Sequence, residues 1–187
     1  MLTNSPSGFY DLYKRMRLSL ERLHWNFTSR EISDPPEVLI ISPGGVASTL
    51  FIKYVSGFLT VNCATDTDRV KHLLRRPTNV KKVILITGDS SEIISSLSRR
   101  GYLGVHSAKM GSPVGVLLRG GLQRLYFKTL VSRQRRYFER DPQATLVINY
   151  DDLWGACKKV ANFIGVDELD FCKTFPSRVK RRNLSPS

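Results

Sequence analysis

The segment EVLIISPGGVASTLFIKYVSGF, residues 37–58, decides the fold of this protein. EVLIIS at 37–42 is an almost unbroken apolar run, which is typical of a strand buried on both faces of a parallel sheet. PGGVAST follows at 43–49, and LFIKYVSGF at 50–58 has the apolar spacing of a helix. A strand, a glycine-rich turn and a helix are therefore predicted in direct succession.

Such a turn can bind a phosphate group, because glycines let backbone N–H groups point inward and a helix start attracts anions. The candidate phosphate-binding residues are Gly44, Gly45, Val46, Ala47, Ser48 and Thr49. An ordinary strand-to-helix turn with packing glycines explains the same residues equally well. No lysine precedes Ser48, as it does in nucleoside triphosphatases, so hydrolysis of ATP or GTP is disfavoured.

Two further apolar runs, KKVILIT at 81–87 and ATLVINY at 144–150, predict two more buried strands. LTVNC at 59–63 predicts a short strand, and the glycines of residues 101–118 predict a loop. Helices are expected at 8–27, 67–74, 89–100, 121–140 and 151–165, and Asp89 or Ser90 is the expected cap of the helix at 89–100. Strands that alternate with helices predict an α/β fold, in which a parallel sheet lies between two layers of helices.

We expect a single domain over residues 1–187, with an N-terminal helical segment at 1–35 and a basic, flexible tail at 173–187. Lys and Arg total 29 against 16 Asp and Glu, and the formal charge of +13 favours anionic partners or a solubilising surface. The three cysteines form no CxxC pair, which argues against a disulfide framework and a structural zinc site. No metal is expected, and the lack of a recognisable signal peptide or membrane-spanning run predicts a cytoplasmic location.

Three blocks, within about residues 37–170, resemble the sulfotransferase family. VLIISPGGVASTLF resembles the loop that binds the 5′-phosphosulfate group, and KKVILITGDSSEIISSLSRRG resembles the strand and helix that bind the 3′-phosphate. ATLVINYDDLWGACKKVANFIGVDE resembles a late strand and helix, in which Tyr150 and Leu153 would pack and Asp152 would cap. The resemblance implies a P-loop-type sheet and 3′-phosphoadenosine 5′-phosphosulfate as the co-substrate.

The chain departs from this family at positions that normally carry charge. Gly45 stands where the resemblance expects Lys or Arg in the loop, with Val46 and Ala47 in place of Ser and Gly. Gly88 stands where an arginine would hold the 3′-phosphate, whereas Ser96 matches the expected serine. Each missing charge-assisted contact is worth roughly 1.5–3 kcal/mol. Arg99, Arg100 and the basic tail are the candidates to replace these cations.

Sulfonate transfer also needs a general base for the acceptor hydroxyl. The family places a His or Glu between the first two blocks, where this chain offers Asp66, Asp68 and His72. His72 and Asp66 are the catalytic candidates. The alternative, favoured for His72 by its neighbours Lys71 and Arg75 in a predicted helix, is a solvated surface residue. His24 and His106 rank lower.

The predicted helix 121–140 carries six Lys and Arg side chains and a single acid, Glu139. It is interpreted as a solvated face, with Leu122, Leu125, Tyr126, Leu130 and Tyr137 packing inward, or as a surface for a polyanionic glycan or nucleic acid. Two functions follow. One is transfer of a sulfonate group to a hydroxyl or amine of a small molecule or glycan. The other is a catalytically degenerate member of the same fold that binds anionic glycan, nucleic acid or protein.

Overall fold

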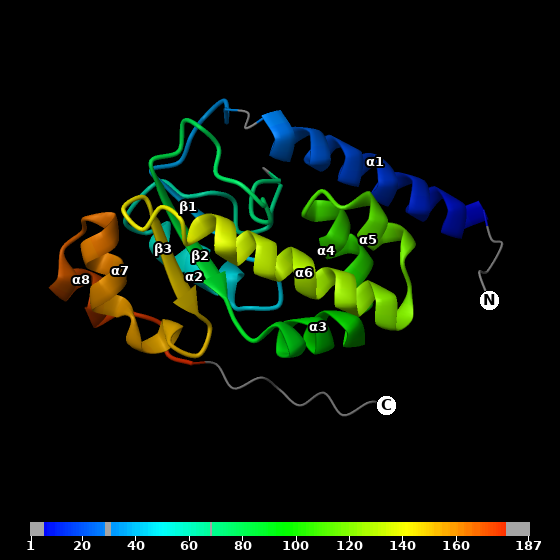
Figure 1. Ribbon diagram of the computed structural model, residues 1–187. Coiled ribbons are helices and arrows are strands. Elements are labelled where there is room, and N and C mark those ends of the chain that lie inside the picture. The colour runs from blue at the N-terminus through cyan, green and yellow to red at the C-terminus, as the bar shows by residue number, and fades with distance from the viewer. Residues whose placement is uncertain (1–5, 29–30, 68, 179–187) are drawn as a thin grey trace.

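The computed structural model describes residues 6–28, 31–67 and 69–178. Strands β1 (Val38–Ile41), β2 (Lys82–Thr87) and β3 (Thr145–Asn149) form one parallel sheet in the order β1-β2-β3. Ile40 of β1 is in register with Ile84 of β2, which is in register with Leu146 of β3. Helices flank this small sheet (Figure 1), so the predicted α/β class and the three buried strands are confirmed.

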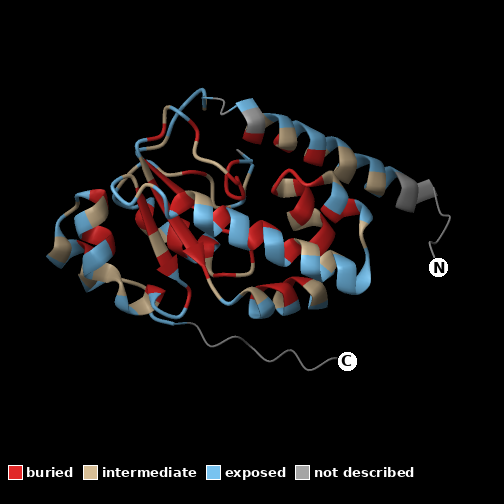
Figure 2. Ribbon diagram, in the orientation of Figure 1, coloured by how far each residue is buried: buried red, intermediate tan, exposed pale blue. Residues whose placement is uncertain are grey.

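Alternate residues of the strands pack into two different apolar clusters, one on each face of the sheet. Ile40, Ile84 and Ile148 belong to the larger cluster, which includes Phe51 and Phe127 from two helices. Leu39, Val83 and Leu85 belong to the smaller cluster with Phe138. Burial on both faces explains why these strands are continuous apolar runs, and the strands are among the most deeply buried parts of the chain (Figure 2).

The helices connect and cover these strands. Their bounds are α1 (Pro6–Thr28), α2 (Ser48–Val55), α3 (Ser90–Arg99), α4 (Leu103–Lys109), α5 (Pro113–Leu117), α6 (Gly120–Phe138), α7 (Cys157–Ile164) and α8 (Glu168–Lys173), with a 3₁₀ turn, η1, at Leu153–Gly155. Asp89 caps α3 by accepting hydrogen bonds from the backbone N–H groups of Ser91 and Glu92, as the sequence predicts. None of the helices in these ranges is both long and apolar enough to cross a bilayer.

The helix predicted at 67–74 is wrong: the described part of this segment is irregular. Asp66 and Arg69 adopt left-handed backbone angles, with φ of 62° and 59°, and these interrupt any helix. The backbone N–H of Lys71 instead donates to the Asp66 carboxylate at 3.1 Å, and its carbonyl accepts from Ser42 at 2.9 Å. Hydrogen bonds to distant residues therefore replace the helical ones, and the third candidate in this region, Asp68, lies outside the described residues.

The loop predicted at 101–118 is also wrong, because this segment contains α4 and α5. Helix α5 begins with two standard N-terminal signals, although the glycines of the segment favour a loop. Pro113 occupies the first helical turn, and the Ser112 hydroxyl accepts from the backbone N–H of Gly115 at 3.1 Å. The strand predicted at 59–63 is reduced to a single bridge between Val61 and Val38.

Two smaller predictions about side chains are wrong as well. Leu122 and Leu125 of α6 are exposed, because the buried stripe of this helix consists of Phe127, Leu130, Val131, Gln134 and Phe138. The first turns of α6 run beside α3, α4 and α5 (Figure 1). Asp152 makes no side-chain capping bond, although Tyr150 and Leu153 are buried as expected. Residues 179–187 of the predicted basic tail lie outside the described residues.

The outer edge of β1 is closed by a side chain instead of a fourth strand. The buried Asn62 side chain accepts from the backbone N–H of Ile40 at 2.7 Å and donates to the Ile40 carbonyl at 3.0 Å. Asn79 bonds Ile32 in the same two-way manner, at 3.1 and 2.7 Å, but at a partly exposed position. The two asparagines therefore make the same hydrogen bonds at different degrees of burial.

Asn62→Ala should lower the free energy of unfolding by about 2–4 kcal/mol, because each buried backbone group left without a partner costs about 1–3 kcal/mol. Asn79→Ala is the matched control and should cost less, since water can reach its partners. Urea denaturation of both variants measures the difference. Equal losses would contradict the view that burial sets the cost.

Candidate functional site

The predicted phosphate-binding loop joins β1 to α2 at the carboxyl end of the sheet. Gly44 and Gly45 have φ of 102° and 75°, angles that only glycine adopts readily. Gly44 also lies so close to His106 that a Cβ on this residue would overlap the imidazole ring. Ser48 is the first residue of α2, as expected. The structure therefore requires glycine at both positions for conformational reasons.

Ser42, the residue after β1, connects this loop to the segment around residue 71. Its backbone N–H donates to the Lys71 carbonyl at 2.9 Å, and its own carbonyl accepts from Nδ1 of His72 at 2.7 Å. Its hydroxyl is 3.0 Å from the hydroxyl of Ser48. All three polar groups of the fully buried Ser42 are used, so Lys71, His72 and the start of α2 are fixed relative to one another.

Lys71 brings a cation to the loop. Its ammonium group donates to the Thr49 hydroxyl at 2.7 Å and to the Ala64 carbonyl at 2.9 Å, and the residue is only 5% exposed. The position of Lys71 was not predicted, because residues 67–74 were expected to form a helix.

Arg100 lies between two of the predicted donor-binding positions. Its guanidinium donates to the Ser96 hydroxyl at 3.2 Å and to the Ser96 carbonyl at 3.0 Å. The same group lies 3.6 Å from where a Cβ of Gly45 would stand, and the Ser96 hydroxyl lies 3.7 Å from that point. Gly45, Ser96 and Arg100 thus converge at one place, and Arg100 is exposed to solvent there.

The position of Gly88 differs, because its surroundings are apolar. A Cβ at Gly88 would meet side-chain carbons of Tyr150, Val46 and Ile93 at 3.5–3.9 Å. Arg178, the last described residue of the tail, pairs with Asp151 at 2.8 Å. The three heavy atoms nearest to the Gly88 Cβ position therefore all belong to uncharged side chains.

His72 is buried, so its interpretation as a solvated surface residue is wrong. Because Nδ1 faces the Ser42 carbonyl, it carries the proton and Nε2 carries the lone pair. Nε2 lies 3.8 Å from the buried Asp66 carboxylate, which binds the Lys109 ammonium at 2.7 Å. The two catalytic candidates, His72 and Asp66, are therefore neighbours.

His106, a weaker catalytic candidate by sequence, lies next to His72 and Asp66. Its ring packs edge-on against His72, with 4.7 Å between centroids and 77° between ring planes. Its Nδ1 faces Gly44 and has no hydrogen-bond partner among the described residues. His72 and His106 are far apart in the sequence. Helix α4, which was expected to be part of a loop, brings His106 next to His72. His24 lies elsewhere, on α1.

Burial lowers the pKa of His72 to about 3; the hydrogen bond to the Ser42 carbonyl opposes this shift, and the nearby Lys109, Lys71 and Arg22 add to it. Burial also lowers the pKa of His106 well below its usual value, with added contributions from His72, Lys109 and Arg100. Both imidazoles are therefore neutral at pH 7. A neutral imidazole with a free lone pair can accept a proton or a hydrogen bond.

A cavity of about 460 Å³ opens beside Asp66. Asp66, Lys109, Arg69 and Arg22 line it together with residues of α1. The cavity reaches Asp66, whereas neither His72 nor residues 43–49 line it. No group of three His, Cys, Asp or Glu side chains within residues 6–28, 31–67 and 69–178 is arranged to hold a metal ion.

No known protein-family model, curated protein or solved structure matches this chain. The geometry of the loop and its neighbours is therefore the basis for assigning a function.

Stability should fall as the pH is lowered from 7 to 5. The unfolded chain takes up a proton on each imidazole below about pH 6.5, whereas the folded chain keeps His72 and His106 neutral. The expected loss in the free energy of unfolding is about 2 kcal/mol for each histidine over this range. His72→Gln should remove about half of the loss. Urea denaturation at pH 7, 6 and 5 measures how the free energy of unfolding depends on pH. A pH dependence that His72→Gln leaves unchanged would refute the prediction.

Proposed function

We propose that this protein is a sulfotransferase-like enzyme. It binds 3′-phosphoadenosine 5′-phosphosulfate at residues 43–49 and transfers the sulfonate group to a hydroxyl or amine of a small acceptor or glycan. The convergence of Arg100 with Gly45 and Ser96 is the observation that supports the proposal most strongly. It supplies a cation at a site where the sequence lacks the expected basic residues.

Two cations beside the loop would bind the donor in this arrangement. The backbone N–H groups of residues 44–49, the Thr49 hydroxyl and the Lys71 ammonium suit the 5′-phosphosulfate group. Ser96 and Arg100 suit the 3′-phosphate, because a guanidinium can form two parallel hydrogen bonds to phosphate oxygens. Lys71 and Arg100 would thus replace the cation missing at Gly45.

In the transfer step, the acceptor oxygen or nitrogen forms a bond to sulfur. The bond from sulfur to the donor's phosphate oxygen breaks, and 3′-phosphoadenosine 5′-phosphate leaves. The acceptor proton passes to a base, for which the unprotonated Nε2 of His72 is the candidate. With a pKa of about 3 it is a weak base, so it would hold the proton only in passing. Asp66, 3.8 Å away, would stabilise the resulting imidazolium, and an acceptor would enter through the cavity beside Asp66.

The apolar surroundings of Gly88 favour a second candidate function. A chain that has lost one of its phosphate cations without a local replacement can keep the fold and bind anionic partners without transferring sulfonate. An acidic glycan, a nucleic acid or an acidic protein surface would suit the net charge of +13. This alternative predicts salt-sensitive binding to such polyanions and no sulfonate transfer.

Arg100→Gln should weaken the binding of 3′-phosphoadenosine 5′-phosphate by about tenfold or more, because it removes a charge-assisted contact to phosphate. Arg99→Gln is the matched control: it makes the same change at the adjacent exposed residue and should leave affinity within about twofold. Isothermal titration calorimetry at fixed ionic strength measures both.

The two candidate functions give different results in this titration. Micromolar binding that is lost in Arg100→Gln alone supports the enzyme, and His72→Gln should then slow transfer more than it weakens nucleotide binding. Absence of binding at millimolar nucleotide would exclude the enzyme. Equal losses in Arg99→Gln and Arg100→Gln would show that total charge, and not this site, attracts the nucleotide.

A further inference from the structure

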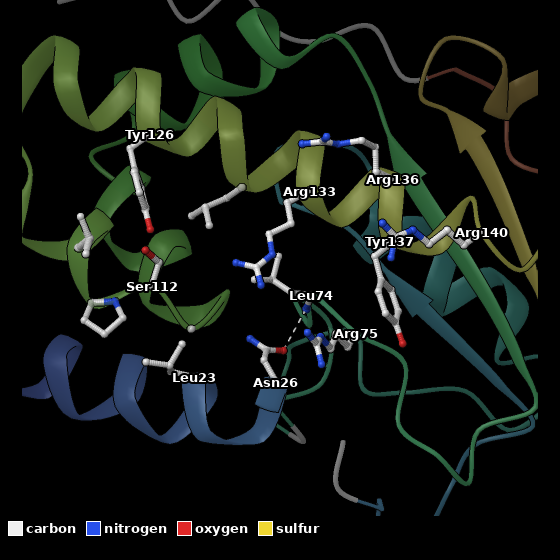
Figure 3. A pocket seen from close by; sticks show the side chains of 14 residues that line it. Leu23, Asn26, Leu74, Arg75, Ser112, Tyr126, Arg133, Arg136, Tyr137 and Arg140 are labelled. Carbon is white, nitrogen blue, oxygen red and sulfur yellow. Dashed lines mark hydrogen bonds between the residues drawn. The ribbon is translucent and has the colours of Figure 1, made fainter. Parts of the chain in front are cut away.

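A second cavity, of about 580 Å³, lies between α1, α5 and α6, apart from the phosphate-binding loop (Figure 3). Its volume falls in the range of small-molecule sites, which is about 300–1,000 Å³. It shares no lining residue with the loop or with the cavity beside Asp66. Any ligand it binds would therefore be separate from the proposed sulfonate donor.

Four arginines line this cavity: Arg75, Arg133, Arg136 and Arg140. No aspartate or glutamate is among the lining residues, and none of the four arginines forms a salt bridge within the described chain. Their neighbours behave differently, because Arg76 pairs with Asp141 at 3.0 Å and Arg135 pairs with Glu139 at 2.7 Å. The available acids thus neutralise arginines outside the cavity, and positive charge accumulates inside it.

The wall of the cavity is held by buried polar contacts. Asn26 of α1 accepts from the backbone N–H of Leu74 at 3.3 Å and donates to the Met110 carbonyl at 3.1 Å. Gln134 of α6 donates to the Leu73 carbonyl at 2.7 Å. The segment carrying Arg75 is therefore tied to both helices, so the cavity is built before a ligand arrives.

The arginines differ in how they face the cavity. In Figure 3, Arg133 extends from α6 toward Leu74, and Arg75 lies on the opposite side of the gap. The Arg75 guanidinium is 5.9 Å from the centre of the Tyr137 ring. Arg136 donates back to the Ser132 carbonyl at 3.3 Å, which keeps it along the helix. Arg133 and Arg75 are thus the best placed pair to contact one anionic group.

Aromatic and apolar side chains complete the lining. Tyr126 and Tyr137 are partly buried and offer ring faces, while Leu74 and Leu130 are buried at the base. Guanidinium groups bind phosphate and sulfate esters through paired hydrogen bonds. Aromatic and aliphatic surfaces bind the flat or apolar part of a ligand. The combination suits a molecule with a ring and an ester anion better than it suits a bare ion.

We propose that the cavity between α1, α5 and α6 binds a small ring-bearing phosphate or sulfate ester, held by Arg75 and Arg133 and flanked by Tyr126 and Tyr137. The alternative ligand for a basic helix is a nucleic acid, which would lie along the outer surface of α6. That surface includes Arg124 and Lys128, which line a different groove with α3. The two possibilities therefore depend on different cations of the same helix.

The test is calorimetric titration of the whole chain with 4-nitrophenyl phosphate, 4-nitrophenyl sulfate and inorganic phosphate. Arg133→Gln and Arg75→Gln should each weaken the binding of the two esters by about tenfold or more, and inorganic phosphate should bind more weakly than either ester. The control Arg124→Gln makes the same change on α6 outside the cavity and should keep affinity within about twofold. An ester affinity that falls in Arg100→Gln but not in Arg133→Gln would place the ester at the phosphate-binding loop and overturn the proposal.

Several outcomes would overturn the proposal. One is the absence of ester binding at millimolar concentration while thermal melting shows the variants to be folded. Another is an equal loss in Arg124→Gln and Arg133→Gln, which would indicate general attraction by charge. A single-stranded oligonucleotide that binds more tightly than the esters, and loses affinity equally in both variants, would indicate a nucleic-acid surface. Preference between the two esters identifies the anion, and equal binding of inorganic phosphate would refute the role of the tyrosines.

Discussion

The hydrogen bonds of Ser42 hold the rest of the candidate site together. This one buried residue uses its N–H, its carbonyl and its hydroxyl to bind Lys71, His72 and Ser48. Leaving any of these groups unpaired in the interior would be costly, so the segment after residue 66 has to return to the end of β1. That return places an ammonium group beside Thr49 and an imidazole beside Asp66. The arrangement of charge around the loop therefore follows from satisfying the backbone of one strand end.

The site also shows how positive charge can be supplied from outside a loop. In this chain the loop residues are small and uncharged, and Gly44 and Gly45 are needed for their backbone angles. The charge comes instead from Lys71, which follows the return segment, and from Arg100, which ends α3. Neither residue is close to the loop in sequence. Two cations from other elements thus lie beside a loop that carries none of its own.

The sequence predicted most of the sheet and little of the site. The strands were evident because burial on both faces requires an apolar run, and Asp89 was a visible start for α3. Residues 67–74 were misread because their apolar spacing is helical, whereas the left-handed angles at Asp66 and Arg69 are not encoded in that spacing. The same error placed His72 at the surface. Helix α4 was not predicted, because glycines surround it in the sequence. The contact between His106 and His72 has no local sequence signal, because it depends on tertiary packing.

The closure of β1 by Asn62 has a consequence for how this protein behaves at high concentration. An open sheet edge offers a row of N–H and C=O groups that a strand from another molecule can join. Here the bridge at Val61, the bond from the Val38 N–H to the Thr60 carbonyl, and the two bonds of Asn62 occupy that row along Val38–Ile40. The asparagine side-chain amide makes the hydrogen bonds of a peptide group but offers no further backbone groups for another strand. It therefore ends the sheet chemically on this side, and protects an apolar strand from the self-association that leads to aggregates.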